Sequence, residues 1–440
     1  MNKTFFLETF GCQMNVVDSE RICHLLAEIG YYRTEHVDNA NLILLNTCSV
    51  RDKAERKVYG HLGSFKPLKS ANPELIIGVG GCVAQQEGEQ LLTNIPFLDL
   101  VFGTHNIHKL PAMVTAVEQD RVRCHETDFL DRETRLQLWP NRADISGGVT
   151  RFVTIMQGCD NFCSFCIVPH VRGREISRPS TEIIREIEGL AAQGVKEVTL
   201  IGQNVNSYGG KDETEISFAE LLRKVALVEG IERLRFTTSH PKDLSDDLIA
   251  TFSEIDTLCN HLHLPVQCGS SPILKRMNRG YTREDYLKKV AKLRQARPDI
   301  RLTSDIIVGF PGETEEDAAA TLSLIEQVRY ADLYLFQYSP RPGTAAAALV
   351  DDISKAVKQE RFDRMLAMQR TISQEVWNAD VGTTLPVLVE GHGRQKSGQL
   401  FGRTTWNRIV NFTGDDPLIG SVQPVRIIKS LKNSQLGELL

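Results

Sequence analysis

The stretch GCDNFCSFC, residues 158–166, sets Cys159, Cys163 and Cys166 in the spacing C-x3-C-x2-C. Three thiolates at this spacing can wrap one iron–sulfur cluster, and no nearby cysteine supplies a fourth ligand. One iron of the cluster would therefore stay open to bind another molecule. Zinc is the alternative, although zinc sites usually combine C-x2-C pairs into a complete set of four ligands. The spacing favours an iron–sulfur loop, and the fold must present that loop to a second reactant.

The ten cysteines stand in a sequence without a signal-peptide pattern and without an apolar run of membrane-spanning length. This combination argues against a disulfide framework and for metal or redox chemistry in a reducing compartment. We therefore expect a cytoplasmic protein with no membrane partner. The formal net charge of −5 excludes a uniformly basic nucleic-acid-binding surface, but it leaves room for a local basic groove.

The N-terminal part of the chain alternates short apolar strands with helical stretches, which is typical of an open parallel α/β sheet. The expected strands are residues 4–9, 41–45, 75–79 and 98–102. The first three of them run directly into Cys12, Cys48 and Cys82. Because the carboxyl ends of parallel strands lie at one edge of a sheet, these cysteines should converge and could hold a second cluster. For any one of them alone, packing of a small apolar side chain is the alternative.

The central part of the chain predicts six strand–helix units. The expected strands are residues 151–159, 197–202, 233–238, 262–266, 301–308 and 333–338. Six units are too few for a closed eight-unit barrel, so we expect an open, partial (β/α)6 barrel. Its lateral mouth would suit a substrate too large to enter a closed barrel. Residues 119–144 are charged and lack periodicity, and they are interpreted as a linker.

The spacing of the three central cysteines resembles the signature of radical S-adenosylmethionine (SAM) enzymes. The resemblance implies a 4Fe–4S cluster whose open iron is chelated by SAM, with Phe165 lying against the adenine. In barrels of this kind the chemistry gathers where strands give way to loops. The polar residues at such positions that we expect to bind SAM are Gln203, Asn204, Ser304 and Asp305. His240, His261 and His263 are interpreted as hydrogen-bonded structural residues instead.

Residues 379–440 change to short strands separated by glycines and polar turns, which predicts a small antiparallel β-barrel. Barrels of this size commonly bind single-stranded or looped nucleic acid. The segment holds seven Lys and Arg against five Asp and Glu, an excess that an ordinary solvated surface explains about as well. The candidate RNA-binding residues are Arg403 and Arg408 here, and Arg172 and Arg174 just after the cysteine loop. A solvated loop is the alternative for the last two.

Seven segments occur together in an order that resembles the methylthiotransferase family. They are NTCSVRDKAE, GCDNFCSFCIVPHVRGREISRP, IGQNVNSYGG, LHLPVQCGS, IVGFPGETEED, FQYSPRPGTAA and GRTTWNRIVNF. The resemblance spans nearly the whole chain. It implies a methylthiotransferase domain at residues 1–118, a radical SAM domain at 145–378 and an RNA-binding TRAM domain at 379–440. Cys268 departs from the family pattern, which usually has serine there, and places a spare thiol near the expected SAM face.

By this resemblance, Cys12, Cys48 and Cys82 would hold an auxiliary 4Fe–4S cluster, and Cys159, Cys163 and Cys166 the radical SAM cluster. The implied reaction is 2-methylthiolation of N6-isopentenyladenosine next to the tRNA anticodon, at position 37. It would consume two SAM molecules and take its sulfur at the auxiliary cluster. The implied partners are the tRNA anticodon stem-loop, an electron donor such as flavodoxin or ferredoxin, and an iron–sulfur carrier.

Three alternatives remain open from the sequence. A methylthiotransferase could act instead on threonylcarbamoyl-adenosine of tRNA or on an aspartate of a ribosomal protein. A non-catalytic iron–sulfur sensor that binds RNA would need no open iron and no SAM site. A zinc-binding RNA protein would be colourless, whereas an iron–sulfur protein purified without oxygen should be brown.

Overall fold

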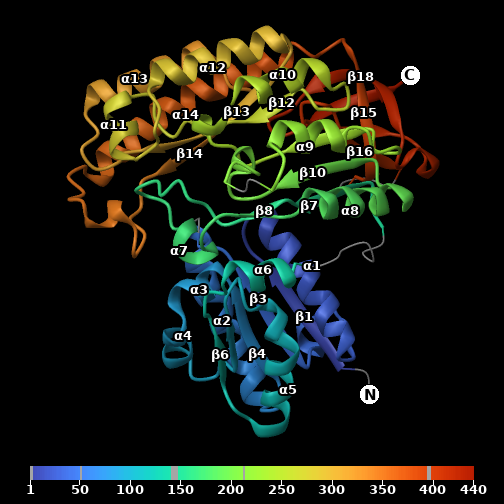
Figure 1. Cartoon of the computed structure of the whole chain (residues 1–440), viewed down its shortest axis with the longest axis vertical. Coiled ribbons are helices and arrows are strands. Elements are labelled where there is room, and N and C mark those ends of the chain that lie inside the picture. The colour runs from blue at the N-terminus through green and yellow to red at the C-terminus, as the bar shows by residue number, and fades with distance from the viewer. Residues whose placement is uncertain (1–2, 50–51, 140–146, 212–213, 394–397) are drawn as a thin grey trace.

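The computed structural model describes residues 3–49, 52–139, 147–211, 214–393 and 398–440. Figure 1 shows an α/β layer formed by the N-terminal part, a larger α/β barrel above it, and a small all-β barrel at the C-terminus. The described part of the chain contains no helix that is long and apolar enough to cross a membrane.

The N-terminal layer is a six-stranded parallel sheet in the order β2-β1-β3-β4-β5-β6. The strands are β1 (Lys3–Thr9), β2 (Tyr31–Arg33), β3 (Leu42–Thr47), β4 (Ile76–Gly81), β5 (Leu100–Phe102) and β6 (Cys124–Glu126). The helices are α1 (Gln13–Glu28), α2 (Asp52–Ala71), α3 (Cys82–Glu87), α4 (Glu89–Asn94) and α5 (Leu110–Asp120). A separate apolar core lies on each face of the sheet, and β3 and β4 are therefore buried along their whole length.

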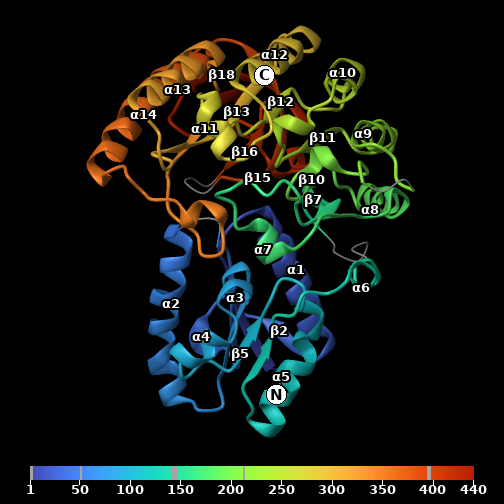
Figure 2. The ribbon, with the colours of Figure 1, turned by 60° about the vertical axis from the view of Figure 1, so that its left-hand side comes forward.

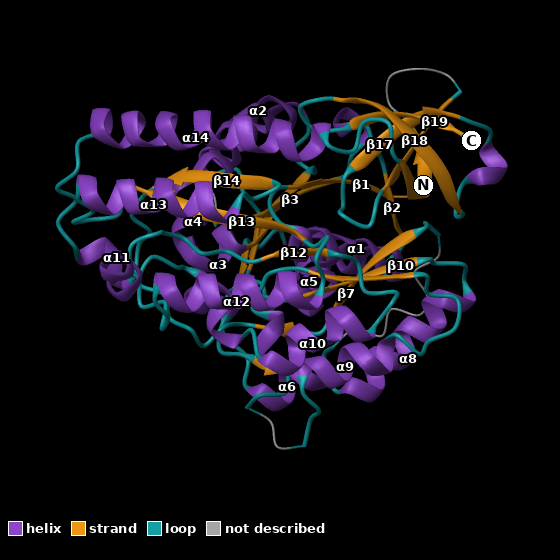
Figure 3. Ribbon diagram, turned by 90° about the horizontal axis from the view of Figure 1, so that it is seen from above, coloured by secondary structure: helices purple, strands orange, loops and turns teal. Residues whose placement is uncertain are grey.

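The central part forms two parallel three-stranded sheets, β11-β10-β7 and β12-β13-β14, which are joined by a parallel bridge between Leu234 and Leu258. The strands are β7 (Thr150–Thr154), β10 (Glu197–Ile201), β11 (Arg233–Phe236), β12 (His261–His263), β13 (Arg301–Val308) and β14 (Asp332–Gln337). The main helices are α8 (Ser180–Ala192), α9 (Phe218–Val225), α10 (Asp246–Glu254), α12 (Arg283–Ala296), α13 (Glu315–Val328) and α14 (Lys355–Asn378). These helices cover the outer face of the strands, as Figure 3 shows from above. The arrangement is an open, partial barrel.

Short elements connect the two large parts and shape the cysteine loop. They are α6 (Arg132–Gln137), the paired strands β8 (Met156–Gln157) and β9 (Ile176–Ser177), α7 (Val168–Arg172) and α11 (Ser271–Arg276). In Figures 1 and 2, α7 lies where the N-terminal layer meets the barrel.

The C-terminal part is a closed barrel in the order β15-β16-β17-β19-β18. Its strands are β15 (Thr384–His392), β16 (Gln399–Arg403), β17 (Ile409–Thr413), β18 (Val422–Ser430) and β19 (Gln435–Leu439). Neighbouring strands are antiparallel except β17 and β19, which pair in parallel. The barrel has its own apolar core.

The predicted fold class is confirmed, with differences in detail, one of which is the parallel pairing of β17 with β19 in a barrel expected to be antiparallel. The short strands β2 and β19 were not expected. The predicted linker contributes β6 to the N-terminal sheet, where Cys124 packs against one of the two cores. The last residues of that linker, 140–144, lie outside the described residues.

Candidate functional site

Cys12, Cys48 and Cys82 lie at the carboxyl ends of three adjacent strands. Cys12 is the residue before α1, Cys48 follows β3, and Cys82 begins α3 directly after β4. Because β1, β3 and β4 are neighbours in the sheet, the three cysteines meet at one edge. A Cβ atom at Gly11 would collide with the Cβ atom of Cys48, so only glycine permits this close approach.

Two buried asparagines hold the backbone around these cysteines. Asn15 Oδ1 lies 3.3 Å from Cys12 Sγ, and its Nδ2 donates to the carbonyl oxygen of Thr47 at 3.0 Å. Asn46 Nδ2 donates to the carbonyl oxygen of Asn15 at 2.8 Å. These bonds join the start of α1 to the end of β3, and they fix the relative positions of Cys12 and Cys48.

A buried cation lies beside the same cysteines. Arg172 Nη2 is 2.7 Å from Asp18 Oδ2, and both side chains are almost inaccessible to solvent. A hydrogen bond from Cys48, together with the charge of Arg172, lowers the pKa of Cys12 to about 6. Burial raises the pKa of Cys82, and Arg172 opposes that rise. The edge of the sheet thus favours thiolate formation at Cys12.

The central cysteine loop is closed by backbone bonds. Cys159 N donates to the carbonyl oxygen of Gly173 at 3.2 Å, and Cys166 N donates to that of Cys163 at 2.9 Å. Gly158 has a φ of +81°, and a Cβ atom there would collide with the carbonyl of Arg174. The loop can therefore fold back on itself only with glycine at this position.

The three thiols of this loop lie close enough to influence one another. Burial raises the pKa of Cys159 to about 11 and that of Cys166 to about 12, and the neighbouring cysteines add to both rises. Both side chains are therefore thiols at neutral pH until iron displaces their protons.

Arg279 and His240 contact Cys163 from the barrel wall. Arg279 Nη1 lies 3.3 Å from Cys163 Sγ, and His240 Nε2 lies 3.8 Å from it. Burial and the charge of Arg279 lower the pKa of His240 to about 2, so the imidazole is neutral. The sequence predicts a structural role for His240, and Arg279 stands in a stretch without a recognisable motif. Their nearness to Cys163 arises only from the tertiary fold.

The residues expected to bind SAM differ in how many hydrogen bonds or ion pairs their side chains already form within the protein. Gln203 Oε1 accepts from Gly158 N at 2.5 Å, at the start of the cysteine loop. Asn204 donates to Asp243 at 2.7 Å and accepts from the backbone of His240. Asp305 lies on β13 with Oδ2 3.5 Å from Nε2 of His263 and is partly exposed.

Two further expected SAM contacts are packed into the protein. Ser304 is fully buried, and its hydroxyl accepts from Val266 N and donates to the carbonyl oxygen of Leu264, each at 2.9 Å. Phe165 packs against the apolar cluster that includes Cys268 and Tyr338. Contact of either residue with SAM stays a prediction.

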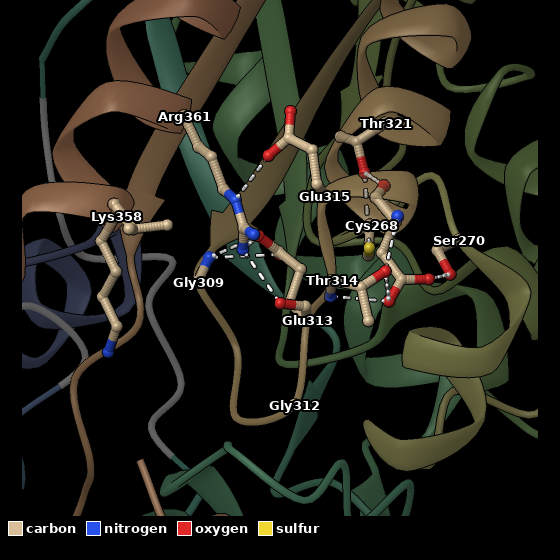
Figure 4. Close-up of polar contacts among 12 residues, drawn as sticks. Cys268, Ser270, Gly309, Gly312, Glu313, Thr314, Glu315, Thr321, Lys358 and Arg361 are labelled. Carbon is tan, nitrogen blue, oxygen red and sulfur yellow. Dashed lines mark hydrogen bonds and ion pairs between the residues drawn. The ribbon is translucent and has the colours of Figure 1, made fainter. Parts of the chain in front are cut away.

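The loop after β13 is held by a buried ion pair, which Figure 4 shows. Both carboxylate oxygens of Glu313 accept from Gly309 N at 3.1 Å, and Arg361 Nη1 donates to Glu313 Oε1 at 3.0 Å. In the same view Cys268 Sγ lies 3.5 Å from Thr321 Oγ1. Cys268 is fully buried, and its thiol is therefore a packed core group.

Buried polar atoms without a partner mark the carboxyl ends of the first barrel strands. Thr154 Oγ1, Asn206 Oδ1 and Ser239 Oγ have no hydrogen-bond partner among the described residues. They follow or end β7, β10 and β11, beside the cysteine loop. Because unpaired buried polar groups are costly, this edge fits a polar ligand such as SAM.

Both sets of cysteines fit an iron–sulfur cluster in the chemistry of their donors, which are three thiols each. No group of three or more His, Cys, Asp or Glu among the described residues converges closely enough to hold a single metal ion. A 4Fe–4S cluster does not need such convergence, because each of its thiolates binds a different iron.

The four arginines expected to contact RNA divide into two classes. Arg174 is exposed beside the cysteine loop, with Nε 2.7 Å from Asp160 and its guanidinium 5.1 Å from the ring of Phe162. Arg403 is partly exposed and paired with Glu390 at 2.5 Å. These two remain predicted RNA contacts.

Arg172 and Arg408 are buried, which differs from the expected contact with RNA. Arg172 is directed to Asp18 and the N-terminal cysteines. Arg408 donates to the carbonyl oxygen of Leu431 at 2.6 Å and lies 4.5 Å from the ring centre of Trp377. Sequence position alone does not distinguish such an arginine from a surface arginine.

Three family models match the chain in succession. Residues 4–103 match the family described as "Uncharacterized protein family UPF0004", residues 153–325 the radical SAM superfamily, and residues 379–440 the TRAM domain. The chain is also similar over 79% of its length to a radical SAM methyltransferase, TsrM, from Kitasatospora setae, with a TM-score of 0.59 and 16% identity over 77% of that chain. At this identity the likeness concerns the fold alone.

Curated relatives match the chain from end to end. A protein of Syntrophotalea carbinolica is 60% identical over 436 residues, which cover 99% of both chains. A protein of Geobacter sulfurreducens is 59% identical over 439 residues, which cover 100% of this chain and 98% of the relative. Both relatives are named tRNA-2-methylthio-N(6)-dimethylallyladenosine synthase.

Proposed function

Because the chain belongs to the family of tRNA-2-methylthio-N(6)-dimethylallyladenosine synthases, we propose that it converts N6-isopentenyladenosine of tRNA to its 2-methylthio derivative. The enzyme is a radical SAM methylthiotransferase that uses SAM and 4Fe–4S clusters. The modified nucleoside would be the one next to the anticodon, at position 37.

The observation that carries this proposal is that two cysteine triplets meet at α7. The N-terminal triplet is Cys12, Cys48 and Cys82, and the central triplet is Cys159, Cys163 and Cys166. Cys82 packs with Ile167 and Val171 in one buried cluster, while the backbone N–H of Cys159 donates to the carbonyl oxygen of Gly173, the residue that ends the helix. Two clusters held here would face the same region. A reaction that needs a radical from one cluster and sulfur from the other requires that proximity.

We assign Cys159, Cys163 and Cys166 to the radical SAM cluster, and Cys12, Cys48 and Cys82 to the auxiliary cluster. When bound, the first cluster supplies the electron that cleaves SAM to a 5'-deoxyadenosyl radical, and the second supplies the sulfur. An aromatic carbon–hydrogen bond offers no acidic proton, so radical chemistry suits this substrate.

The chain's own residues would prepare the radical site. Arg279 places a cation beside the Cys163 sulfur, and the neutral His240 approaches the same atom. The unpaired oxygens of Asn206 and Ser239 offer hydrogen-bonding positions to the polar groups of SAM. Gln203 holds the first turn of the cysteine loop.

The open barrel and the TRAM domain suit a tRNA substrate. An anticodon loop can present an unstacked base at less cost than a duplex can. Arg174 and Arg403 are the arginines that could reach its phosphates, since their side chains are at least partly exposed. We further propose a cytoplasmic location, a flavodoxin or ferredoxin as electron donor, and an iron–sulfur carrier that supplies the clusters.

The test is incubation of the reconstituted, reduced protein with SAM and an isopentenylated anticodon stem-loop without oxygen, followed by mass spectrometry of the nucleosides. We expect 2-methylthio-N6-isopentenyladenosine. The same stem-loop with unmodified adenosine is the matched control and should give less product. Cleavage of SAM without methylthiolation would overturn the proposed substrate and direct the search to threonylcarbamoyl-adenosine or a ribosomal-protein aspartate.

A further inference from the structure

Helix α7 lies between the two cysteine triplets and contacts both. It starts just after Cys166, and its residue Val171 packs with Cys82 in one buried cluster. Gly173, which ends the helix, accepts a hydrogen bond from Cys159 N at 3.2 Å. Figure 2 shows α7 between the barrel and the helices α1 and α3. A displacement of one triplet relative to the other must therefore disturb this helix.

The carboxyl end of α7 is tied to the N-terminal sheet. Thr104 Oγ1 donates to the carbonyl oxygen of Val171 at 2.6 Å, and His105 Nε2 lies 3.0 Å from that of Arg172. Helix carbonyls of the last turn need such partners because they have none within the helix. The backbone that carries Arg172 is consequently fixed by two side chains of the loop after β5.

The Arg172 side chain is directed into the auxiliary cysteine site. Its Nη2 atom lies 2.7 Å from Asp18 Oδ2, and the two side chains are 5% and 7% exposed. Its charge lowers the pKa of Cys12 and opposes the rise that burial causes in the pKa of Cys82, and the preceding residue, Val171, packs with Cys82 in one buried cluster. A buried ion pair is seldom worth its desolvation cost in stability alone. The Arg172–Asp18 pair lies beside the auxiliary cysteine site, where a positive charge can stabilise an anionic cluster.

A cluster held by three thiolates is anionic, and reduction adds one further negative charge. A guanidinium in a low-dielectric site stabilises the more negative, reduced form, and hydrogen bonds to cluster sulfurs also raise reduction potentials. Asp18 acts in the opposite direction through its own charge. At the same time, it orients the guanidinium towards the cysteines.

We infer that Arg172 is a positioning residue of the auxiliary cluster: its buried charge raises the reduction potential of the cluster, while Asp18 orients the guanidinium and limits that effect. This inference rests on the proposed function, because it requires a cluster at Cys12, Cys48 and Cys82. It gives α7 a role beyond connecting the cysteine loop to β9.

The test is an EPR-monitored redox titration in the Cys163→Ala protein, where the auxiliary cluster is the one that remains. Arg172→Gln should shift the midpoint potential to more negative values, and Asp18→Asn should shift it to more positive values. Arg172→Lys, which keeps the charge, should restore most of the wild-type value. A purely structural pair would lower the melting temperature in all three variants without shifts of opposite sign.

The matched control is Arg178→Gln, which breaks another buried ion pair, between Arg178 and Glu186 on the barrel. It should lower stability and leave the midpoint potential unchanged. Equal potentials in wild type, Arg172→Gln and Asp18→Asn, with full iron and sulfide content, would overturn the inference. No SAM or tRNA is present, so a wrong substrate assignment cannot produce that result. If the Cys163→Ala protein held no cluster at all, both the two-cluster proposal and this inference would fall.

Discussion

Arg279 Nη1 lies 3.3 Å from the sulfur of Cys163, while its Nη2 donates to the carbonyl oxygen of Pro265 at 2.7 Å. The same guanidinium bonds through Nε to the hydroxyl of Tyr281 at 3.0 Å. Its geometry is therefore fixed by the barrel wall before any cluster is bound. A cation held rigidly at this distance can donate a hydrogen bond to the Cys163 sulfur.

Replacement of Arg279 should weaken the radical SAM site. A hydrogen bond to a charged group contributes about 1.5–3 kcal/mol, so Arg279→Met should lower the rate of SAM cleavage by about tenfold or more. The assay is release of 5'-deoxyadenosine by the reduced protein, with iron content measured in parallel. The exposed Lys275→Met is the control and should behave as wild type. Undiminished cleavage by Arg279→Met with full iron content would contradict this role.

Acid should destabilise the protein through His105. Burial lowers the pKa of His105 to about 4 from an ordinary value of 6.5, so the folded state keeps the imidazole neutral while the unfolded state protonates it. The neutral His105 therefore adds its full contribution to the free energy of unfolding above pH 6.5. This contribution is lost, at about 1.4 kcal/mol per pH unit, as the pH falls towards 4. The melting temperature should therefore drop less between pH 7.5 and 5.5 in His105→Gln than in wild type. The exposed His36→Gln should retain the full drop; an equal drop in His105→Gln would refute the assignment.

The ion pair between Arg361 and Glu313 should stabilise the loop after β13. Removing one partner of a buried pair typically costs about 3–5 kcal/mol, because the remaining charge stays buried. Arg361→Met should lower the melting temperature by several degrees and weaken SAM binding, measured by calorimetry. Arg364→Met removes a more exposed partner of Glu315 and should have little effect. Equal effects of the two substitutions would count against a special role for Glu313.

Arg301 should stabilise the interface between the C-terminal barrel and the radical SAM barrel. Its guanidinium lies 4.4 Å from the ring centre of Trp377 and 3.8 Å from that of Trp406, and it pairs with Asp380 at 2.5 Å. Arg301→Met should expose the connection at residues 379–383 to proteases and weaken stem-loop binding several-fold. SAM cleavage without RNA should stay unchanged. Lys292 is exposed, and Lys292→Met is the control. Equal protease resistance of the two variants would disprove the role of Arg301 at this interface.

The places of both cysteine triplets in the fold could be predicted because each triplet has a pattern that is visible in the sequence. The spacing of Cys159, Cys163 and Cys166 is visible in the sequence itself. Cys12, Cys48 and Cys82 required one further step, the rule that parallel strands end at a common edge. The helices and most strands followed from apolar periodicity in the same way.

Features that depend on tertiary contact could not be predicted. Nothing local distinguishes Arg279, which reaches Cys163, from Arg283 in the next helix. Arg172 and Arg408 were expected at the surface, but the fold buries both. The strands β2 and β6 have only three residues each. They form because the neighbouring strands β1 and β5 have free backbone groups at the sheet edge to pair with, and a three-residue sequence pattern cannot indicate that pairing.

The division of labour between the two cysteine triplets is tested most directly by comparing Cys48→Ala with Cys163→Ala. Each reconstituted variant is incubated with SAM, a reductant and the isopentenylated stem-loop, and 5'-deoxyadenosine and methylthiolated nucleoside are quantified by mass spectrometry. We predict that Cys163→Ala abolishes SAM cleavage while retaining the auxiliary cluster, and that Cys48→Ala still cleaves SAM but transfers no sulfur. Normal methylthiolation by Cys48→Ala would contradict the assignment of a sulfur-supplying cluster to Cys12, Cys48 and Cys82.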